Sequence, residues 1–263
     1  MNLTSRPTRG GENRRRPGPV IAFVLGLLLL GSSASLLAGC DGGERVQLLL
    51  EAKRKDASGE AMDKARDVIE RRLGAAGASG ATVVRQGPNR ILATFGAVGD
   101  TGPIKALIGR SARLDVWLVD LSATPEQIAA GEAPPGTRLL AFPGEGPDGR
   151  IAVRGRPIVN GSMIADARSG FDPAGQPVVN LRFDDLGSRR FARATRENVG
   201  RPFAIALDDV VVSAPDVNEP ILGGEAMISG NFTVESAREL AIALRSGALP
   251  FDLVVVEERR LEQ

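Results

Sequence analysis

The chain has 263 residues, of which 43% are hydrophobic and 25% are charged, so it is long enough and apolar enough for one or two folded domains. It contains no His and no Tyr, and Cys40 is its one cysteine. This composition excludes His-based catalytic triads, His-liganded zinc sites and an intrachain disulfide bond. Because no imidazole is present to activate a serine, we expect a protein that is not an enzyme and holds no cofactor or metal.

Positive charge is concentrated at the N-terminus. The first 39 residues carry five arginines against Glu12 alone, namely Arg6, Arg9, Arg14, Arg15 and Arg16. The rest of the chain is therefore slightly acidic and offers no electrostatic footprint for nucleic acid. An apolar run over residues 20–30 follows the arginines, and this order is typical of a signal peptide.

A small-residue stretch then leads to Leu37-Ala38-Gly39-Cys40, which resembles a bacterial lipobox. The resemblance implies a signal peptide over residues 1–39 and a lipidated Cys40 that begins a short tether over 40–45. Asp41 resembles an inner-membrane retention signal of Gram-negative lipoproteins. The alternative is an uncleaved anchor helix over residues 20–39, which has about the length needed to span a bilayer. Both alternatives anchor the chain at the inner membrane and place its bulk outside the cytoplasm, because the arginines should stay inside.

Residues 46–119 alternate between strand and helix patterns. We expect strands at 46–52, 82–85, 90–95 and 113–119, and helices at 60–76 and 101–109. The order β-α-β-β-α-β predicts a ferredoxin-like base over residues 46–120.

Residues 121–157 are rich in Pro and Gly and predict a long connector, with one helical turn at 125–130. A G-x-G-x-x-G pattern occurs here at Gly144, Gly146 and Gly149. A phosphate site is disfavoured because Pro147 interrupts the pattern, acidic residues flank it, and no helix is expected to follow.

Residues 158–249 predict a second α+β unit. The expected elements are a turn at 172–175, a strand at 178–183, a helix capped by Asp184 or Asp185, a hairpin turning at Asp208-Asp209, and a helix from Thr233 to Gly247. Both Asp pairs are better read as caps and turns than as paired catalytic carboxylates. A last strand at 251–257 is expected to rejoin the first sheet. The fold class is thus α+β, with the second unit inserted into a base formed by residues 46–120 and 250–260.

Two groups of segments resemble one protein family. Residues 66–73, 84–91 and 112–117 are similar to the base of the first periplasmic domain of SecD, a subunit of the SecDF protein-export complex. The ordered series 191–200, 204–208, 212–215, 228–233 and 244–250 resembles the head of that domain more closely. The resemblance covers about residues 46–259.

The resemblance implies an extracytoplasmic accessory to Sec-dependent protein export. Its expected partners are unfolded preprotein or peptide, Sec translocon subunits such as SecF and a SecY-type channel, and the membrane through a lipid anchor. Proton-driven pulling is not expected, because the family's later membrane helices have no counterpart in this sequence. An interlobe hinge is expected at Gly155, Pro157, Gly247 and Pro250. The alternative function is a repurposed envelope lipoprotein that binds another protein or peptide through the same fold.

Overall fold

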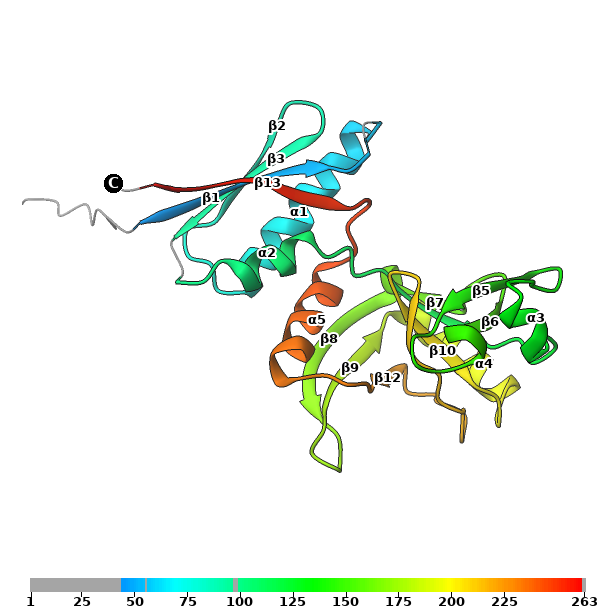
Figure 1. Cartoon of the computed structure of the whole chain (residues 1–263). Helices are drawn as coiled ribbons and strands as arrows, with labels where there is room; N and C mark the ends of the chain where they lie inside the picture. Colours follow the sequence, from blue (N-terminus) through cyan, green and yellow to red (C-terminus); the bar gives the residue numbers. More distant parts are fainter. Residues whose placement is uncertain (1–43, 55, 97–98, 262–263) are drawn as a thin grey trace, which may run out of the picture. The chain divides into compact units, whose positions relative to one another are not determined.

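The chain folds into three β-sheets, each of which is contacted by at least one helix (Figure 1). The computed structural model describes residues 44–54, 56–96 and 99–261. The sheets have four, six and three strands. The expected mixed α+β class is confirmed.

The four-stranded sheet joins the two ends of the described chain. Its strands are β1 (Arg45–Ala52), β2 (Thr82–Gln86), β3 (Arg90–Gly96) and β13 (Leu253–Leu261). They lie in the order β13-β1-β3-β2, and every neighbouring pair is antiparallel. Alternate residues of β1 are buried, so one face of this sheet meets a hydrophobic core.

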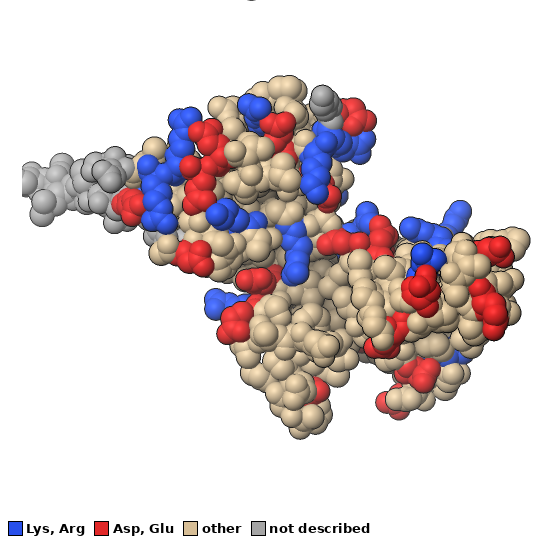
Figure 2. All heavy atoms as spheres, in the orientation of Figure 1, with Lys and Arg blue, Asp and Glu red and all other residues tan. Residues whose placement is uncertain are grey.

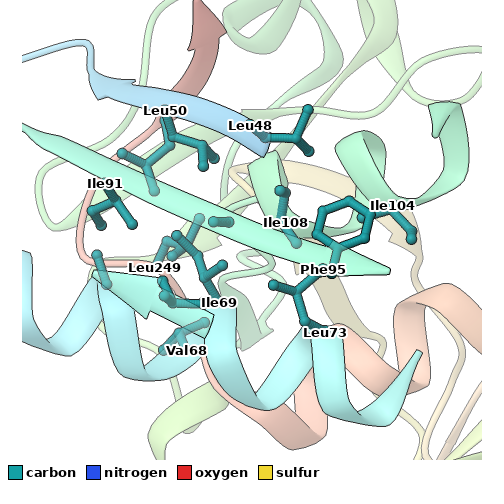
Figure 3. Close-up of a cluster of buried hydrophobic side chains, with 14 of the residues drawn as sticks. Leu48, Leu50, Val68, Ile69, Leu73, Ile91, Phe95, Ile104, Ile108 and Leu249 are labelled. Carbon is teal, nitrogen blue, oxygen red and sulfur yellow. The ribbon is translucent and has the colours of Figure 1, made fainter. Parts of the chain in front are cut away.

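Two helices supply the other side of that core. They are α1 (Gly59–Ala75) and α2 (Gly102–Gly109). The Ser58 hydroxyl caps α1 by accepting a hydrogen bond from the Ala61 N–H at 3.2 Å. Figure 3 shows side chains from the sheet and from both helices meeting in one cluster, with Leu249 joining them from near the C-terminus.

The six-stranded sheet has the order β6-β5-β11-β10-β4-β7. Its strands are β4 (Leu114–Leu118), β5 (Thr137–Ala141), β6 (Arg150–Arg154), β7 (Val159–Asn160), β10 (Phe203–Leu207) and β11 (Val210–Ser213). The expectation that the strand at 113–119 closes the first sheet is wrong, because β4 pairs with β10 and β7 instead. The fourth strand of the first sheet is β13. The ferredoxin-like label for the base stays a prediction.

The expected connector over residues 121–157 is also corrected. It contains the short helix α3 (Pro125–Ala129) and the antiparallel pair β5 and β6, and β5 lies parallel to β11 in the six-stranded sheet. The glycines that indicated an irregular connector lie instead in turns with positive φ, including Gly131, Gly136 and Gly144.

The three-stranded sheet has the order β12-β9-β8. Its strands are β8 (Ile164–Phe171), β9 (Pro177–Phe183) and β12 (Glu225–Ile228). Helix α5 (Val234–Ser246) packs on β8 and β9, and its Ala237, Leu240 and Leu244 share a core with Val179. Helix α4 (Asp185–Glu197) follows β9 and contacts β7. We call the part of the chain from β4 to α5 the head.

The chain passes between the four-stranded sheet and the head twice, and one buried arginine holds both passages. Arg72 projects from α1 and its guanidinium is fully buried. It donates hydrogen bonds to the carbonyl oxygens of Leu107 at 2.8 Å and Gly247 at 3.0 Å, and to that of Arg110. Burial lowers the pKa of Arg72 to about 10, so the side chain stays charged at neutral pH.

Candidate functional site

The head contains an apolar groove between its two sheets. The cavity has a volume of about 330 Å³. It is lined by Val116 of β4, Leu181 of β9, Phe191 of α4, Phe203 and Ile205 of β10, Ala226–Ile228 of β12, and the segment 215–219 with Ile221. A concave site with mostly apolar walls is the usual form of a binding pocket.

Aromatic rings form much of the floor of this groove. The Phe191 ring lies 5.2 Å from the Phe183 ring and 6.3 Å from the Phe203 ring, between centroids. Such tilted and edge-to-face pairs stabilise each other beyond the area they bury. Phe191 and Phe203 line the groove and come from α4 and β10, and Phe183 of β9 packs against Phe191, so three elements contribute to this aromatic cluster.

Residues 215–221 form one wall of the groove and are fixed at both ends. The Phe203 N–H donates to the Pro215 carbonyl at 3.0 Å, and the Val217 N–H donates to the Arg201 carbonyl at 3.0 Å. At the other end, the buried Thr195 hydroxyl accepts from the Ile221 N–H at 3.0 Å. These bonds hold the wall against the end of α4 and the start of β10.

The opposite wall ends in a free strand edge. Among the described strands, β12 pairs with β9 alone and is the last strand of its sheet. Its Ile228 is fully buried, whereas Met227 is 47% exposed at the groove. An open edge of this kind presents unpaired backbone groups to any extended peptide.

A second hollow of about 470 Å³ lies on the other side of Met227. It shares Leu181, Ile221 and Ala226 with the groove and adds charged residues of both signs, Asp166, Arg168, Arg182 and Glu225. The open edge of β12 therefore lies between an apolar hollow and a polar one. This arrangement suits an amphipathic extended chain and offers no activated nucleophile.

The residues predicted for signal recognition and anchoring fall outside the described ranges. They are Leu37, Ala38, Gly39, Cys40 and Asp41. Among the described helices, none is long and apolar enough to cross a bilayer. Lipid anchoring therefore stays a prediction.

The four predicted hinge residues lie in two different places. Gly155 and Pro157 lie between β6 and β7, inside the head, and the Gly155 N–H donates to the Gly136 carbonyl at 2.7 Å. Gly247 and Pro250 lie between α5 and β13, where the chain leaves the head, and Arg72 binds the Gly247 carbonyl there. The other passage runs through residues 110–113 and not through 121–157. A hinge at these positions stays a prediction.

The Asp pairs are caps and turn residues, as expected. Asp184 caps α4 by accepting from the Gly187 N–H at 2.7 Å. Asp208 and Asp209 have φ values of 53° and 65° in the β10–β11 turn. Asp208 has a further role that the sequence pattern did not indicate, because its carboxylate accepts from the Arg113 N–H at 2.8 Å and so fixes the passage into the head.

The glycine pattern at 144–149 lies in the β5–β6 turn. Gly144, Gly146 and Gly149 all have positive φ. Only the single 3₁₀ turn Pro147–Gly149 occurs there, and strand β6 follows it. The motif therefore lacks the helix N-terminus that a dinucleotide site requires.

Charges of both signs intermingle over the four-stranded sheet and α2 on the face shown in Figure 2. Several form ion pairs, including Arg90 with Glu51 at 2.6 Å and Lys105 with Glu258 at 2.8 Å. This part of the face therefore presents no large field of one sign.

Two family models match the chain. The model of the SecDF P1 head subdomain matches residues 137–251, and the model of the N-terminal part of the P1 domain of protein translocase subunit SecDF matches residues 62–121. The chain is 36% identical over 211 residues to the protein translocase subunit SecD of Rickettsia bellii, a match that covers 80% of this chain and 40% of that protein. It is also 36% identical over 214 residues to SecD of Magnetococcus marinus, covering 80% and 41%.

Solved structures agree with these matches. The chain aligns with a SecDF structure in a super-membrane-facing form with a TM-score of 0.68 and 34% identity, covering 82% of this chain and 30% of that one. A second structure, of a SecDF chain described as part of a membrane component that enhances protein export, aligns with a TM-score of 0.63 and 33% identity, covering 82% of this chain and 100% of that one. The chain thus spans about 40% of the length of the curated relatives it matches. It belongs to the SecD family and corresponds to the family's first periplasmic domain, P1.

Proposed function

We propose that this chain is an extracytoplasmic, SecD-like accessory to Sec-dependent protein export that holds translocating preprotein in the head groove. The observation that carries the proposal is the apolar groove beside the free edge of β12, in a domain of the SecD family. The proposal covers contact with the emerging chain and assigns no proton-driven step. Translocon subunits such as SecF and a SecY-type channel are the proposed neighbours, and a lipidated Cys40 is the proposed membrane anchor.

The groove and the edge suit an unfolded chain for separate reasons. An extended segment that adds to β12 satisfies its own backbone groups there, which gives affinity without a fixed sequence. Every second side chain of such a segment would point into the groove, whose floor of Phe191 and Phe203 accepts apolar groups. Preproteins of many sequences would therefore bind, provided that they are extended and contain spaced apolar residues.

Site-specific photocrosslinking in living cells tests this proposal. A benzophenone amino acid at Met227 would face the groove, and the same amino acid at Phe171 is the matched control. Phe171 lies on the same sheet, at the end of β8, and is 64% exposed. We expect position 227 to capture secretory precursors or SecY-type channel subunits, and position 171 to capture them much less.

Substitution Met227→Asp adds a functional test. Because Met227 is exposed, the change should alter the stability of the fold by no more than about 0.5 kcal/mol. A carboxylate at the rim of the groove should nevertheless weaken the capture of precursor by a crosslinker at the neighbouring position 225. Capture of other envelope proteins alone would refute the export role and favour a repurposed binding lipoprotein.

A further inference from the structure

Helix α4 exposes a row of arginines on the surface of the head. Its buried stripe consists of Gly187, Phe191 and Thr195, which recur every four residues. The exposed face carries four arginines, Arg189, Arg190, Arg193 and Arg196. None of the four forms an ion pair with another residue in the part of the chain that the structure describes, although Asp185 and Glu197 lie on the same helix.

The arginines border a shallow apolar hollow that is separate from the head groove. It has a volume of about 410 Å³. Its apolar lining comes from Leu118, Ile158, Leu186 and Ala194, and Arg189, Arg190 and Arg193 stand beside it, with Glu197 and Asn198 completing the lining. The arginine stems can lie along this apolar surface while their guanidinium groups remain outside.

Large aliphatic side chains are exposed at both ends of the row. Leu186, in the first turn of α4, is 45% exposed, and Val199, just past its last turn, is 49% exposed. At 1.5 Å per residue, the helix between them is roughly 20 Å long. An arginine-bearing helix with an exposed leucine in its first turn and an exposed valine just past its end resembles a helix that lies in a membrane interface.

We propose that the exposed face of α4 docks on an anionic phospholipid surface. The four arginines would meet lipid phosphates, and Leu186 and Val199 would enter the boundary between headgroups and acyl chains. An anionic bilayer matches this footprint better than an acidic peptide does, because the arginines and the exposed Leu186 and Val199 extend along the whole length of the helix and are not confined to the hollow. The proposal adds a contact to the proposed function, and requires that the chain is held at a membrane.

The test uses the full chain reconstituted on vesicles. An azide-bearing amino acid at position 186 is labelled with an environment-sensitive fluorophore, and brominated lipids in the bilayer quench it on contact. Vesicles contain either phosphatidylcholine alone or phosphatidylcholine with 30% phosphatidylglycerol, a composition that we choose for the assay. We expect quenching with phosphatidylglycerol, little with phosphatidylcholine, and loss of quenching in about 0.5 M salt, where the Debye length falls to roughly 4 Å.

A matched pair of variants separates the site from overall charge. The double substitution Arg189→Gln with Arg193→Gln should reduce the docked population about 25-fold, because each arginine near an anionic surface contributes about five-fold. The control Arg238→Gln with Arg245→Gln removes the same charge from exposed positions on α5 and should leave quenching unchanged. Equal quenching in both lipids, or equal effects of the two variants, would overturn the proposal.

Two further outcomes are decisive. Flotation with pure phosphatidylcholine vesicles reports anchoring by the N-terminal segment independently of α4. If the chain does not float with pure phosphatidylcholine vesicles, flotation with vesicles that contain phosphatidylglycerol replaces quenching as the readout. The α4 variant should then float less than the α5 control variant. If no quenching or flotation depends on α4, while a fluorescent glutamate-rich peptide binds in a manner that needs Arg189 and Arg193, the face is a protein-docking site and the lipid proposal is wrong.

Discussion

Substitution Arg72→Met should destabilise the protein substantially, because it removes a buried cation that binds both passages between the four-stranded sheet and the head. The guanidinium donates to the carbonyl oxygens of Leu107 at 2.8 Å and Gly247 at 3.0 Å, with additional bonds to those of Arg110 and Ser111. Each buried carbonyl left without a donor costs about 1–3 kcal/mol.

Part of that cost is recovered, because methionine no longer requires a charge to be buried. The lowered pKa of Arg72 shows that burial already disfavours the charged form. The loss of the two well-formed hydrogen bonds to Leu107 and Gly247 costs more than the removal of the buried charge recovers. We therefore expect the free energy of unfolding to fall by about 3 kcal/mol. Arg72→Lys should lose less stability than Arg72→Met, because an ammonium keeps a charged donor at this position. It should still be less stable than the parent, because an ammonium cannot span the separated carbonyls.

The assay is guanidinium unfolding of the full chain in a non-ionic detergent, followed by the fluorescence of Trp117, the one tryptophan of the chain. Arg71→Met is the matched control, because Arg71 is exposed and donates to the Ser246 carbonyl at 2.9 Å. We expect the control to cost under about 1 kcal/mol. An Arg72→Met variant that loses no more stability than Arg71→Met would refute the view that this guanidinium holds the two passages.

Three more predictions follow from single residues. Burial raises the pKa of the Asp115 carboxyl group above its ordinary value of 3.8. The folded state therefore binds the carboxyl proton more tightly than the unfolded state does, and the protein loses stability as pH rises through the folded pKa. Asp115→Asn should therefore be at least as stable as the parent at pH 7 in thermal unfolding, and any advantage should disappear as pH falls toward 3.8; a variant less stable at pH 7 than at pH 4, relative to the parent, would contradict this. Gly224→Ala should lower the free energy of unfolding by about 1–3 kcal/mol, because φ is +69° and a new Cβ would lie 2.7 Å from the Ser188 Cβ. Gly175→Ala is the control: φ is +78° but the space around it is open, so only backbone strain is added and the loss in the same denaturation assay should be smaller. Cys40→Ser should abolish labelling by radioactive palmitate and release the chain from the membrane fraction; membrane association without labelling would favour the uncleaved anchor helix.

Hydrophobic periodicity was sufficient to predict most individual elements. The stripe from Ala61 to Ala76 predicts α1 to within a residue or two at each end, and the caps Asp184 and Thr233 mark the starts of α4 and α5 correctly. Strand β8 was missed because its sequence, Ile-Ala-Asp-Ala-Arg-Ser-Gly-Phe, is small and polar and is typical of a loop. The strand pattern of β4 was correct, but a local pattern does not specify which sheet a strand joins.

The functional surfaces were harder to predict than the elements that form them. The groove combines side chains from β4, α4, β9, β10 and β12, which are distant in sequence and share no motif. Arg72 could have been noticed, since it lies three residues after the buried Ile69 and next to Leu73, on the apolar stripe of α1. An arginine at such a position needs buried acceptors, and here those acceptors are backbone carbonyls that sequence does not specify.

The pairing of β1 with β13 limits the order in which the sheets can fold during synthesis. The two strands pair across about 200 residues of chain, so β1 lacks one of its two neighbours until residues 253–261 have been made. All strands of the six-stranded and three-stranded sheets lie between residues 114 and 228, so the head has every strand it needs well before then. During synthesis the head can therefore fold first, and the four-stranded sheet is the last part of the described chain to close.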